Sequence, residues 1–215
     1  MYKKKPFFIV FEGVEGCGKS YQSQKLKKNL EKKGIKSLLT REPGGTRSAE
    51  SIRRLILKDY FNKGKKEKFD KYTDTLLYLA ARNEHIKNKI KPALKKRRVV
   101  ICDRFVDSTL AYQVYGKKVN KHFIDHIHKF ILQGIKPNII FILKVSSKSS
   151  RLRLKKRRTK NRYDNFSQSF YTKAQKSFLK LSRNKKNYFV LDSSLNNPDL
   201  EKKIFKIVSK HLKIK

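Results

Sequence analysis

The sequence has no tryptophan, one methionine and two cysteines among its 215 residues. Cys17 and Cys102 stand alone, so they form neither a disulfide framework nor a cysteine metal cluster, and they favour a reducing, cytoplasmic location. The chain also lacks an apolar run long enough to span a membrane and lacks a secretory leader pattern. These absences predict a cytoplasmic protein with no membrane partner.

Acidic residues are scarce, with 17 Asp and Glu against 56 Lys and Arg, which gives a formal net charge of +39. A basic excess of this size attracts polyanions such as nucleic acids and nucleotides. The lysines are spread over every segment, which favours solvated faces produced by compositional drift over a dedicated nucleic-acid surface. We therefore expect only nonspecific nucleic-acid binding, weakened by salt.

The length favours one domain covering residues 1–215, along which short apolar runs alternate with longer helical patterns. This alternation predicts a three-layer α/β/α architecture around a five-stranded parallel sheet. The predicted strands are 7–11, 37–40, 99–102, 138–143 and 188–191. The predicted helices are 21–33, 49–58, 73–91, 107–115, 121–132 and an amphipathic helix near the C-terminus, with a lysine-rich surface connection at 61–69.

The segment 13–20 reads Gly-Val-Glu-Gly-Cys-Gly-Lys-Ser and matches the pattern G-x-x-x-x-G-K-[ST]. It lies between the first predicted strand and the first predicted helix, where backbone N–H groups of such a loop surround a phosphate chain. Lys19 is expected to reach the β- and γ-phosphates of ATP, and the Ser20 hydroxyl to bind Mg²⁺. The pattern predicts a P-loop NTPase fold. The residues expected to contact ATP are Gly13, Val14, Glu15, Gly16, Cys17, Gly18, Lys19 and Ser20.

Asp103 and Arg104 follow the third predicted strand, at the sheet edge where α/β proteins bind ligands. Asp103 is placed to hold Mg²⁺ or its waters, and Arg104 to bind a substrate phosphate. An arginine where a motor ATPase carries a second carboxylate favours transfer to an anionic acceptor over hydrolysis. The guanine-binding pattern N-K-x-D is absent, which disfavours a GTPase. A purely structural ion pair is the alternative for Asp103 and Arg104.

A dense basic run covers residues 151–162. Composition alone allows a solvated helix face or an RNA-binding patch. In a chain with a phosphate loop, a helical lid at about 150–165, whose arginines close over ATP, is favoured.

Four motifs together resemble the thymidylate kinases, which phosphorylate dTMP to dTDP with MgATP in dTTP biosynthesis. They are Phe-Glu-Gly at 11–13, Thr-Arg-Glu-Pro-Gly-Gly-Thr at 40–46, Leu-Tyr-Leu-Ala-Ala-Arg at 77–82 and Asp-Arg-Phe-Val-Asp-Ser-Thr-Leu-Ala-Tyr-Gln at 103–113. The resemblance covers nearly the whole chain. The resemblance implies a homodimer and the subtype whose catalytic arginines lie in the lid.

The resemblance also implies roles around the acceptor phosphate. Glu12 and Glu15 would flank the sugar and phosphate of dTMP, with Glu15 able to pair with a lid arginine. Arg53 and Arg104 would bind the phosphate through their planar guanidinium groups.

Around the base, the resemblance implies that Tyr78 stacks on thymine, where the family usually has Phe. Arg82 would hydrogen-bond the base edge, Thr109 and Gln113 would lie nearby, and Tyr112 would exclude a ribose 2′-hydroxyl. Without the motifs, core packing would be the preferred interpretation of Tyr78, Thr109 and Tyr112.

In the lid, Arg153 aligns with a residue that lies against adenine, and Arg157 with the catalytic lid arginine. The sequence leaves open whether Arg158 or Arg162 takes the place of Arg157. The residues expected to act on the transferring phosphoryl group are Glu15, Lys19, Arg104 and Arg157. Two rival functions stay open: a nucleotide or deoxynucleoside kinase with another acceptor, and a non-catalytic RNA-binding protein.

Overall fold

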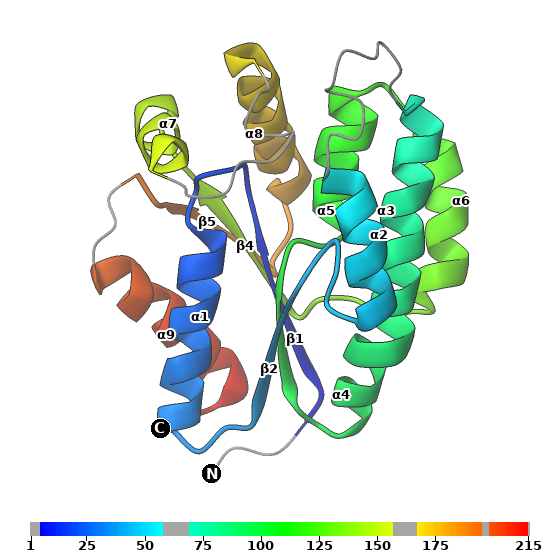
Figure 1. Cartoon of the computed structure of the whole chain (residues 1–215). Helices are drawn as coiled ribbons and strands as arrows, with labels where there is room; N and C mark the ends of the chain where they lie inside the picture. The colour runs from blue at the N-terminus through cyan, green and yellow to red at the C-terminus, as the bar shows by residue number, and fades with distance from the viewer. Residues whose placement is uncertain (1–4, 58–68, 157–166, 195–197, 215) are drawn as a thin grey trace.

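The computed structural model describes residues 5–57, 69–156, 167–194 and 198–214. Its centre is a parallel sheet of five strands in the order β2-β3-β1-β4-β5 (Figure 1). The strands are β1 (Phe7–Glu12), β2 (Ser37–Arg41), β3 (Val99–Asp103), β4 (Ile139–Lys144) and β5 (Tyr188–Asp192). All five predicted strands are confirmed, and each boundary lies within one residue of its predicted place.

Helices cover both faces of the sheet, with α1 and α9 on one side and α3 to α6 on the other (Figure 1). The helices are α1 (Lys19–Lys32), α2 (Arg47–Leu57), α3 (Lys71–His85), α4 (Lys91–Lys95), α5 (Val106–Thr109), α6 (Lys121–Leu132), α7 (Ser147–Lys155), α8 (Gln168–Ser182) and α9 (Pro198–Leu212). The predicted three-layer architecture is confirmed. Within the described ranges, no helix is both long enough and apolar enough to cross a membrane.

Two predicted helices differ in their internal geometry. The predicted helix 73–91 begins earlier, at Lys71, and passes through a π-helical segment, Ile86–Ile90, before α4 ends at Lys95. The predicted helix 107–115 is a short α5 followed by a π-helical segment, Leu110–Gly116. The predicted connection at 61–69 lies outside the described residues, apart from its last position.

The central strands are apolar and buried along their length, as expected for a parallel sheet covered on both faces. Phe11 stacks on Phe141, and Phe8 meets Phe105 edge to face, with ring centroids 5.1 Å apart in both pairs. This packing provides a rigid base for the carboxyl ends of the strands.

The register brings the carboxyl ends of β1, β2 and β3 together, since Phe11 and Arg41 both pair with Asp103. Two backbone hydrogen bonds continue this pattern past the strands: Arg104 N donates to Phe11 O and Glu42 N donates to Asp103 O, each over 2.9 Å. The residues that follow three different strands are therefore held side by side at one edge.

Candidate active site

A cavity of about 390 Å³ opens at this edge and gathers residues that are far apart in the sequence. The predicted site residues on its walls are Glu15, Gly16, Gly18, Lys19, Ser20, Arg53, Tyr78, Arg82, Asp103, Arg104, Thr109, Tyr112, Gln113 and Arg153. Sequence reasoning did not assign seven further lining residues, which are Tyr21, Arg41, Glu42, Pro43, Leu57, Ser108 and Leu154. One space thus contains both the phosphate loop and the predicted acceptor residues.

The phosphate loop turns on glycines that adopt positive φ angles. At Gly16, φ is 70°, and an added Cβ would lie 2.8 Å from the carbonyl oxygen of Ser150. The Ser150 hydroxyl donates to the carbonyl of Glu15 over 2.9 Å, which ties the loop to α7. Only glycine allows this close approach, so the loop can present its backbone toward the cavity. The predicted loop residues Gly13, Val14 and Cys17 lie behind this surface and do not line the cavity.

The Lys19 side chain folds back into the loop. Its Nζ donates to the carbonyls of Gly13 and Val14 over 3.1 and 2.8 Å, and the residue is only 6% exposed. Burial raises the pKa of the neighbouring Cys17 thiol, which keeps it neutral beside the ammonium group. The loop therefore holds a positive charge at the place where a phosphate chain would lie.

Ser20 and Asp103 meet across the cavity edge, where Ser20 Oγ donates to Asp103 Oδ2 over 2.5 Å. Hydroxyl and carboxylate oxygens are ligands that Mg²⁺ prefers, together with water and substrate phosphates. Within the described ranges, no group of three or more His, Cys, Asp or Glu side chains forms a metal site made by protein alone. The pair fits a magnesium ion that is bound mainly through nucleotide phosphates.

Arg104 has the left-handed backbone angle φ 74°, which aims its guanidinium along the cavity wall. It donates to Gly13 O, Ser108 Oγ and Glu15 Oε1 over 3.0, 3.0 and 2.7 Å. Burial opposes its charge, but Glu15, with smaller contributions from Tyr112 and other groups, outweighs it, so its pKa lies above the ordinary value. Arg104 is a permanent cation that connects the phosphate loop to α5.

Glu12, predicted to flank the acceptor, does not line the cavity and is fully buried. Its carboxylate accepts hydrogen bonds from Phe105 N, Ser108 N and Ser108 Oγ over 2.8, 3.2 and 2.6 Å. Burial, and then the charge of Asp107, raise the pKa of Glu12 to about 7. Because the side chain turns toward α5, Glu12 supports the Arg104 turn from behind the cavity.

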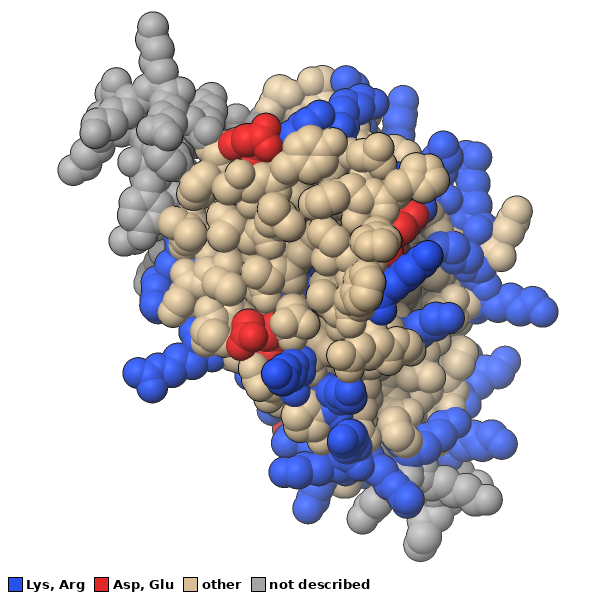
Figure 2. Space-filling view, turned by 90° about the vertical axis from the view of Figure 1, so that its right-hand side faces the viewer, with Lys and Arg blue, Asp and Glu red and all other residues tan. Residues whose placement is uncertain are grey.

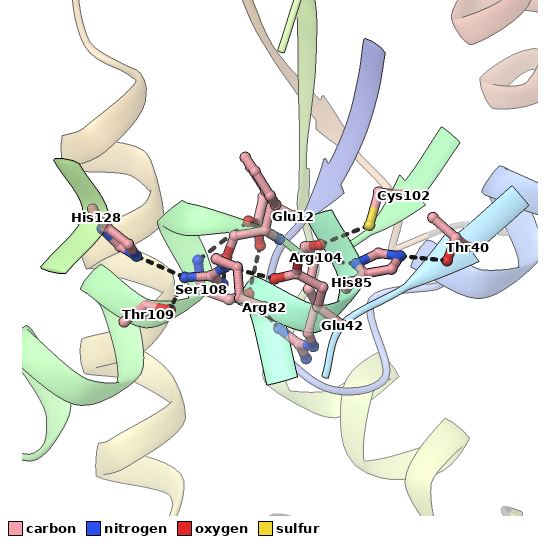
Figure 3. A network of polar contacts seen from close by, with 11 residues as sticks. Glu12, Thr40, Glu42, Arg82, His85, Cys102, Arg104, Ser108, Thr109 and His128 are labelled. Atoms are coloured by element: carbon pink, nitrogen blue, oxygen red, sulfur yellow. Dashed lines mark hydrogen bonds and ion pairs between the residues drawn. The ribbon is translucent and has the colours of Figure 1, made fainter. Parts of the chain in front are cut away.

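A buried polar network forms another wall (Figure 3). Arg82, 3% exposed, donates from Nε to Glu42 Oε2 over 2.7 Å, and His85 Nδ1 lies 3.1 Å from Glu42 Oε1. Burial alone would raise the pKa of Glu42, but Arg82 and His85 outweigh it and lower that pKa. His85 Nε2 also lies 2.6 Å from Thr40 Oγ1. The network holds a charged guanidinium in a region from which water is largely excluded.

Arg53 and Arg153 approach the cavity from α2 and α7. Arg53 Nη1 donates to Pro43 O over 2.6 Å, and burial lowers the pKa of its guanidinium, which stays charged. Arg153 donates to the carbonyls of Gly16, Ser193 and Ser194 over 3.2, 2.7 and 3.0 Å. Thus α7 is attached both to the phosphate loop and to the end of β5.

Part of the predicted lid can be located. Its first residues, 150–155, belong to α7, which begins at Ser147. Arg157, Arg158 and Arg162 lie outside the described residues, so the choice among them stays as the sequence left it.

A phosphate loop, an oxygen pair suited to Mg²⁺ and arginines on the facing walls define a P-loop phosphotransferase for an anionic acceptor.

The comparisons with known proteins give the family. The family model for thymidylate kinase matches residues 11–204. A thymidylate kinase of Aster yellows witches'-broom phytoplasma is 40% identical over 210 residues, and one of Mycoplasma capricolum is 35% identical over 209, with 96% of both chains covered in each case. The crystal structure of thymidylate kinase from Ehrlichia chaffeensis matches with a TM-score of 0.73 and 29% identity, covering 95% of this chain and 99% of that one. The chain belongs to the thymidylate kinase family, and it is therefore a kinase and a nucleotide-dependent transferase.

Proposed function

We propose that this chain transfers the γ-phosphoryl group of ATP to dTMP, giving dTDP and ADP, within the cavity at the sheet edge. The observation that carries the proposal is the single cavity shared by Lys19, Arg104 and Arg82. ATP would place its phosphates against the loop, and dTMP would occupy the part between Arg104 and Arg82. A phosphate loop alone would support any nucleotide hydrolase, whereas the second anionic cradle supports a phosphate acceptor.

The reaction is an in-line displacement between two bound anions. An oxygen of the dTMP phosphate forms a bond to the γ-phosphorus of ATP, and the bond from that phosphorus to the bridging β-phosphate oxygen breaks. The attacking oxygen is already ionised, so no general base is required, and catalysis consists of positioning and charge neutralisation. Lys19 and Arg104 supply positive charge from the described walls, and Arg157 would supply it from the lid. Glu15 holds Arg104 through their 2.7 Å ion pair.

Ser20 and Asp103 would hold Mg²⁺ through their oxygens, directly or through water. The bound ion would neutralise charge on the β- and γ-phosphates. Arg53, which lines the same cavity as Arg104, would bind the acceptor phosphate with it.

The base would lie between Tyr78 and Arg82, with Thr109 and Gln113 beside it, since all four side chains line the cavity. Tyr112 is 5% exposed and stacks on Phe170 with ring centroids 5.8 Å apart. A ring held in this way leaves little room for a 2′-hydroxyl, which supports a preference for deoxyribose.

We also propose that two copies associate through α3 and α6. These helices lie on the side that faces the viewer in Figure 2, where uncharged residues predominate in the central area and most lysine and arginine side chains lie toward the edge. Tyr72 and Leu76 on α3 are 36% and 46% exposed, and Phe130 on α6 is 66% exposed. An apolar centre lets two strongly basic chains associate with most of their charges at the rim. We further propose a single kinase domain over residues 1–215, with its lid at about 150–165, acting in the cytoplasm.

The proposed reaction is tested by measuring ADP release with MgATP and four acceptors: dTMP, dUMP, AMP and thymidine. We expect dTMP to give the highest kcat/KM. A higher value for AMP or thymidine would assign a different kinase activity. Absence of ATP turnover with any monophosphate, together with selective RNA binding at physiological salt, would replace the kinase proposal by RNA recognition.

The proposed dimer is tested by light scattering at micromolar concentration, where Phe130→Glu should convert a dimer to a monomer. A monomeric wild-type protein would contradict the dimer and leave the reaction untouched.

A further inference from the structure

Arg82 is almost completely engaged inside the protein. A guanidinium group carries only N–H donors and has no acceptor. Its Nε donates to Glu42, Nη1 donates to Thr109 Oγ1 and lies 2.9 Å from His128 Nε2, and Nη2 donates to Phe105 O over 2.8 Å (Figure 3). Within the described part of the chain, these contacts leave one N–H, on Nη2, for the cavity.

The contact with His128 fixes the state of the imidazole. Because Arg82 can only donate, Nε2 of His128 must accept, and the ring proton lies on Nδ1. Burial, and then the charge of Arg82, lower the pKa of His128 to about 3, while Glu42 and Asp125 act in the opposite direction. His128 is 6% exposed and follows the buried Ile124 on the inner face of α6. The histidine is therefore a neutral acceptor that holds Nη1.

We propose that His128 is a positioning residue that makes the site selective for a base with a carbonyl oxygen, over one with an amino group, at the edge that Arg82 contacts. The proposal rests on the proposed binding of dTMP in this cavity. Held by four acceptors, Arg82 presents a single N–H in a fixed direction. That donor suits the O4 acceptor of thymine and opposes the N4 amino group of cytosine.

A structural role alone would predict something different. If His128 only packed α6 against the site, its loss would lower stability and affect all acceptors alike. If it positions Arg82, its loss removes one of the two contacts of Nη1 and lets the planar guanidinium tilt, so that the free Nη2 N–H can turn away from an amino group and discrimination between thymine and cytosine falls. The ratio of kcat/KM for dTMP to that for dCMP separates the two roles.

The experiment compares His128→Leu, which removes the acceptor, with His128→Gln, whose amide oxygen restores one near the place of Nε2. We expect His128→Leu to lower the dTMP-to-dCMP ratio about tenfold, mainly through a higher KM for dTMP, with kcat close to wild type. His128→Gln should recover most of the ratio. His122→Leu, an exposed histidine on the same helix, is the control and should match wild type.

An unchanged ratio in folded His128→Leu, or equal losses for dTMP and dCMP, would overturn the proposal while wild-type transfer to dTMP leaves the proposed function intact. A wild-type enzyme inactive with dTMP would overturn both. Should His128→Leu fail to fold, His128→Phe, which keeps a ring and lacks the acceptor, takes its place with the same expected ratio.

Discussion

The two walls of the cavity are built in different ways. On the acceptor wall, buried side chains bond to one another: Arg82, Glu42 and His85 are 3%, 5% and 0% exposed (Figure 3). On the donor wall, side chains bond mainly to backbone carbonyls, as Lys19 does with Gly13 and Val14 and as Arg153 does with Gly16 and Ser193.

The difference corresponds to what each wall would bind. A triphosphate is shared by many nucleotides, and backbone N–H groups together with cations held by backbone carbonyls are sufficient to bind it. A base differs from other bases only in the placement of donors and acceptors, so its wall must hold polar groups in fixed directions. The walls meet at the ion pair between Arg104 and Glu15. In this pair, 13% of the Arg104 side chain and 18% of the Glu15 side chain are exposed.

Removing the charge of the donor wall should have the largest effect. Lys19→Ala should lower kcat about 10³-fold or more, because a cation beside the transferring phosphoryl group is lost. The measurement is dTMP-dependent ADP formation, with circular dichroism to confirm the fold. Lys28→Ala, an exposed lysine on the same helix, is the control. Near-normal turnover in Lys19→Ala would refute the catalytic assignment.

Removing the buried ion pair of the acceptor wall should lower the stability of the fold. Glu42→Gln leaves Arg82 buried without its carboxylate partner, which should lower the free energy of unfolding by about 3–5 kcal/mol. Urea unfolding measures the change. Glu31→Gln, which breaks an exposed pair with Lys27, should cost less than about 1 kcal/mol. Equal losses of unfolding free energy for the two substitutions would mean that the buried ion pair of the acceptor wall stabilises the fold no more than an exposed surface pair does.

A third substitution should affect the KM for ATP and leave the KM for dTMP unchanged. Arg153→Ala removes the guanidinium that joins α7 to the phosphate loop, and it should raise KM for ATP about tenfold with KM for dTMP unchanged. Steady-state kinetics with each substrate varied in turn gives both constants. The matched control is Lys155→Ala, exposed on the same helix. A parallel rise in KM for dTMP would show that the walls are coupled and not separate.

The sequence predicted the donor wall better than the acceptor wall. Buried parallel strands are continuous apolar runs, and the phosphate loop is a contiguous pattern, so segments 7–11 and 13–20 predict their own structure. Arg104 was found because it directly follows a strand. Each of these signals lies within a few neighbouring residues.

The acceptor network gave weaker signals. Glu42 belonged to a recognised motif, but nothing in that motif shows that its carboxylate meets Arg82, 40 residues away. His85 and His128 fitted only the helical periodicity of their segments. Periodicity predicts that a residue is buried, but not which residue it contacts. Glu12 was predicted to flank the substrate from the resemblance to the family, whereas its side chain turns toward α5. Such contacts depend on sheet register and helix packing, which no local pattern contains.

The smallest effect concerns the proton on His128. Its pKa is lowered from 6.5 to about 3 on folding, so below pH 6.5 the unfolded chain takes up a proton that the folded chain does not. The stability that depends on neutral His128 is therefore complete above pH 6.5 and is lost as the pH falls toward 3. His128→Gln has no such proton, and the carboxylates of Glu42 and Asp125 are common to both proteins. Between pH 7 and pH 5.5, wild type should lose about 1 kcal/mol more of its free energy of unfolding than His128→Gln. Equal losses would mean that the folded protein carries a charged His128, which could not accept from Arg82.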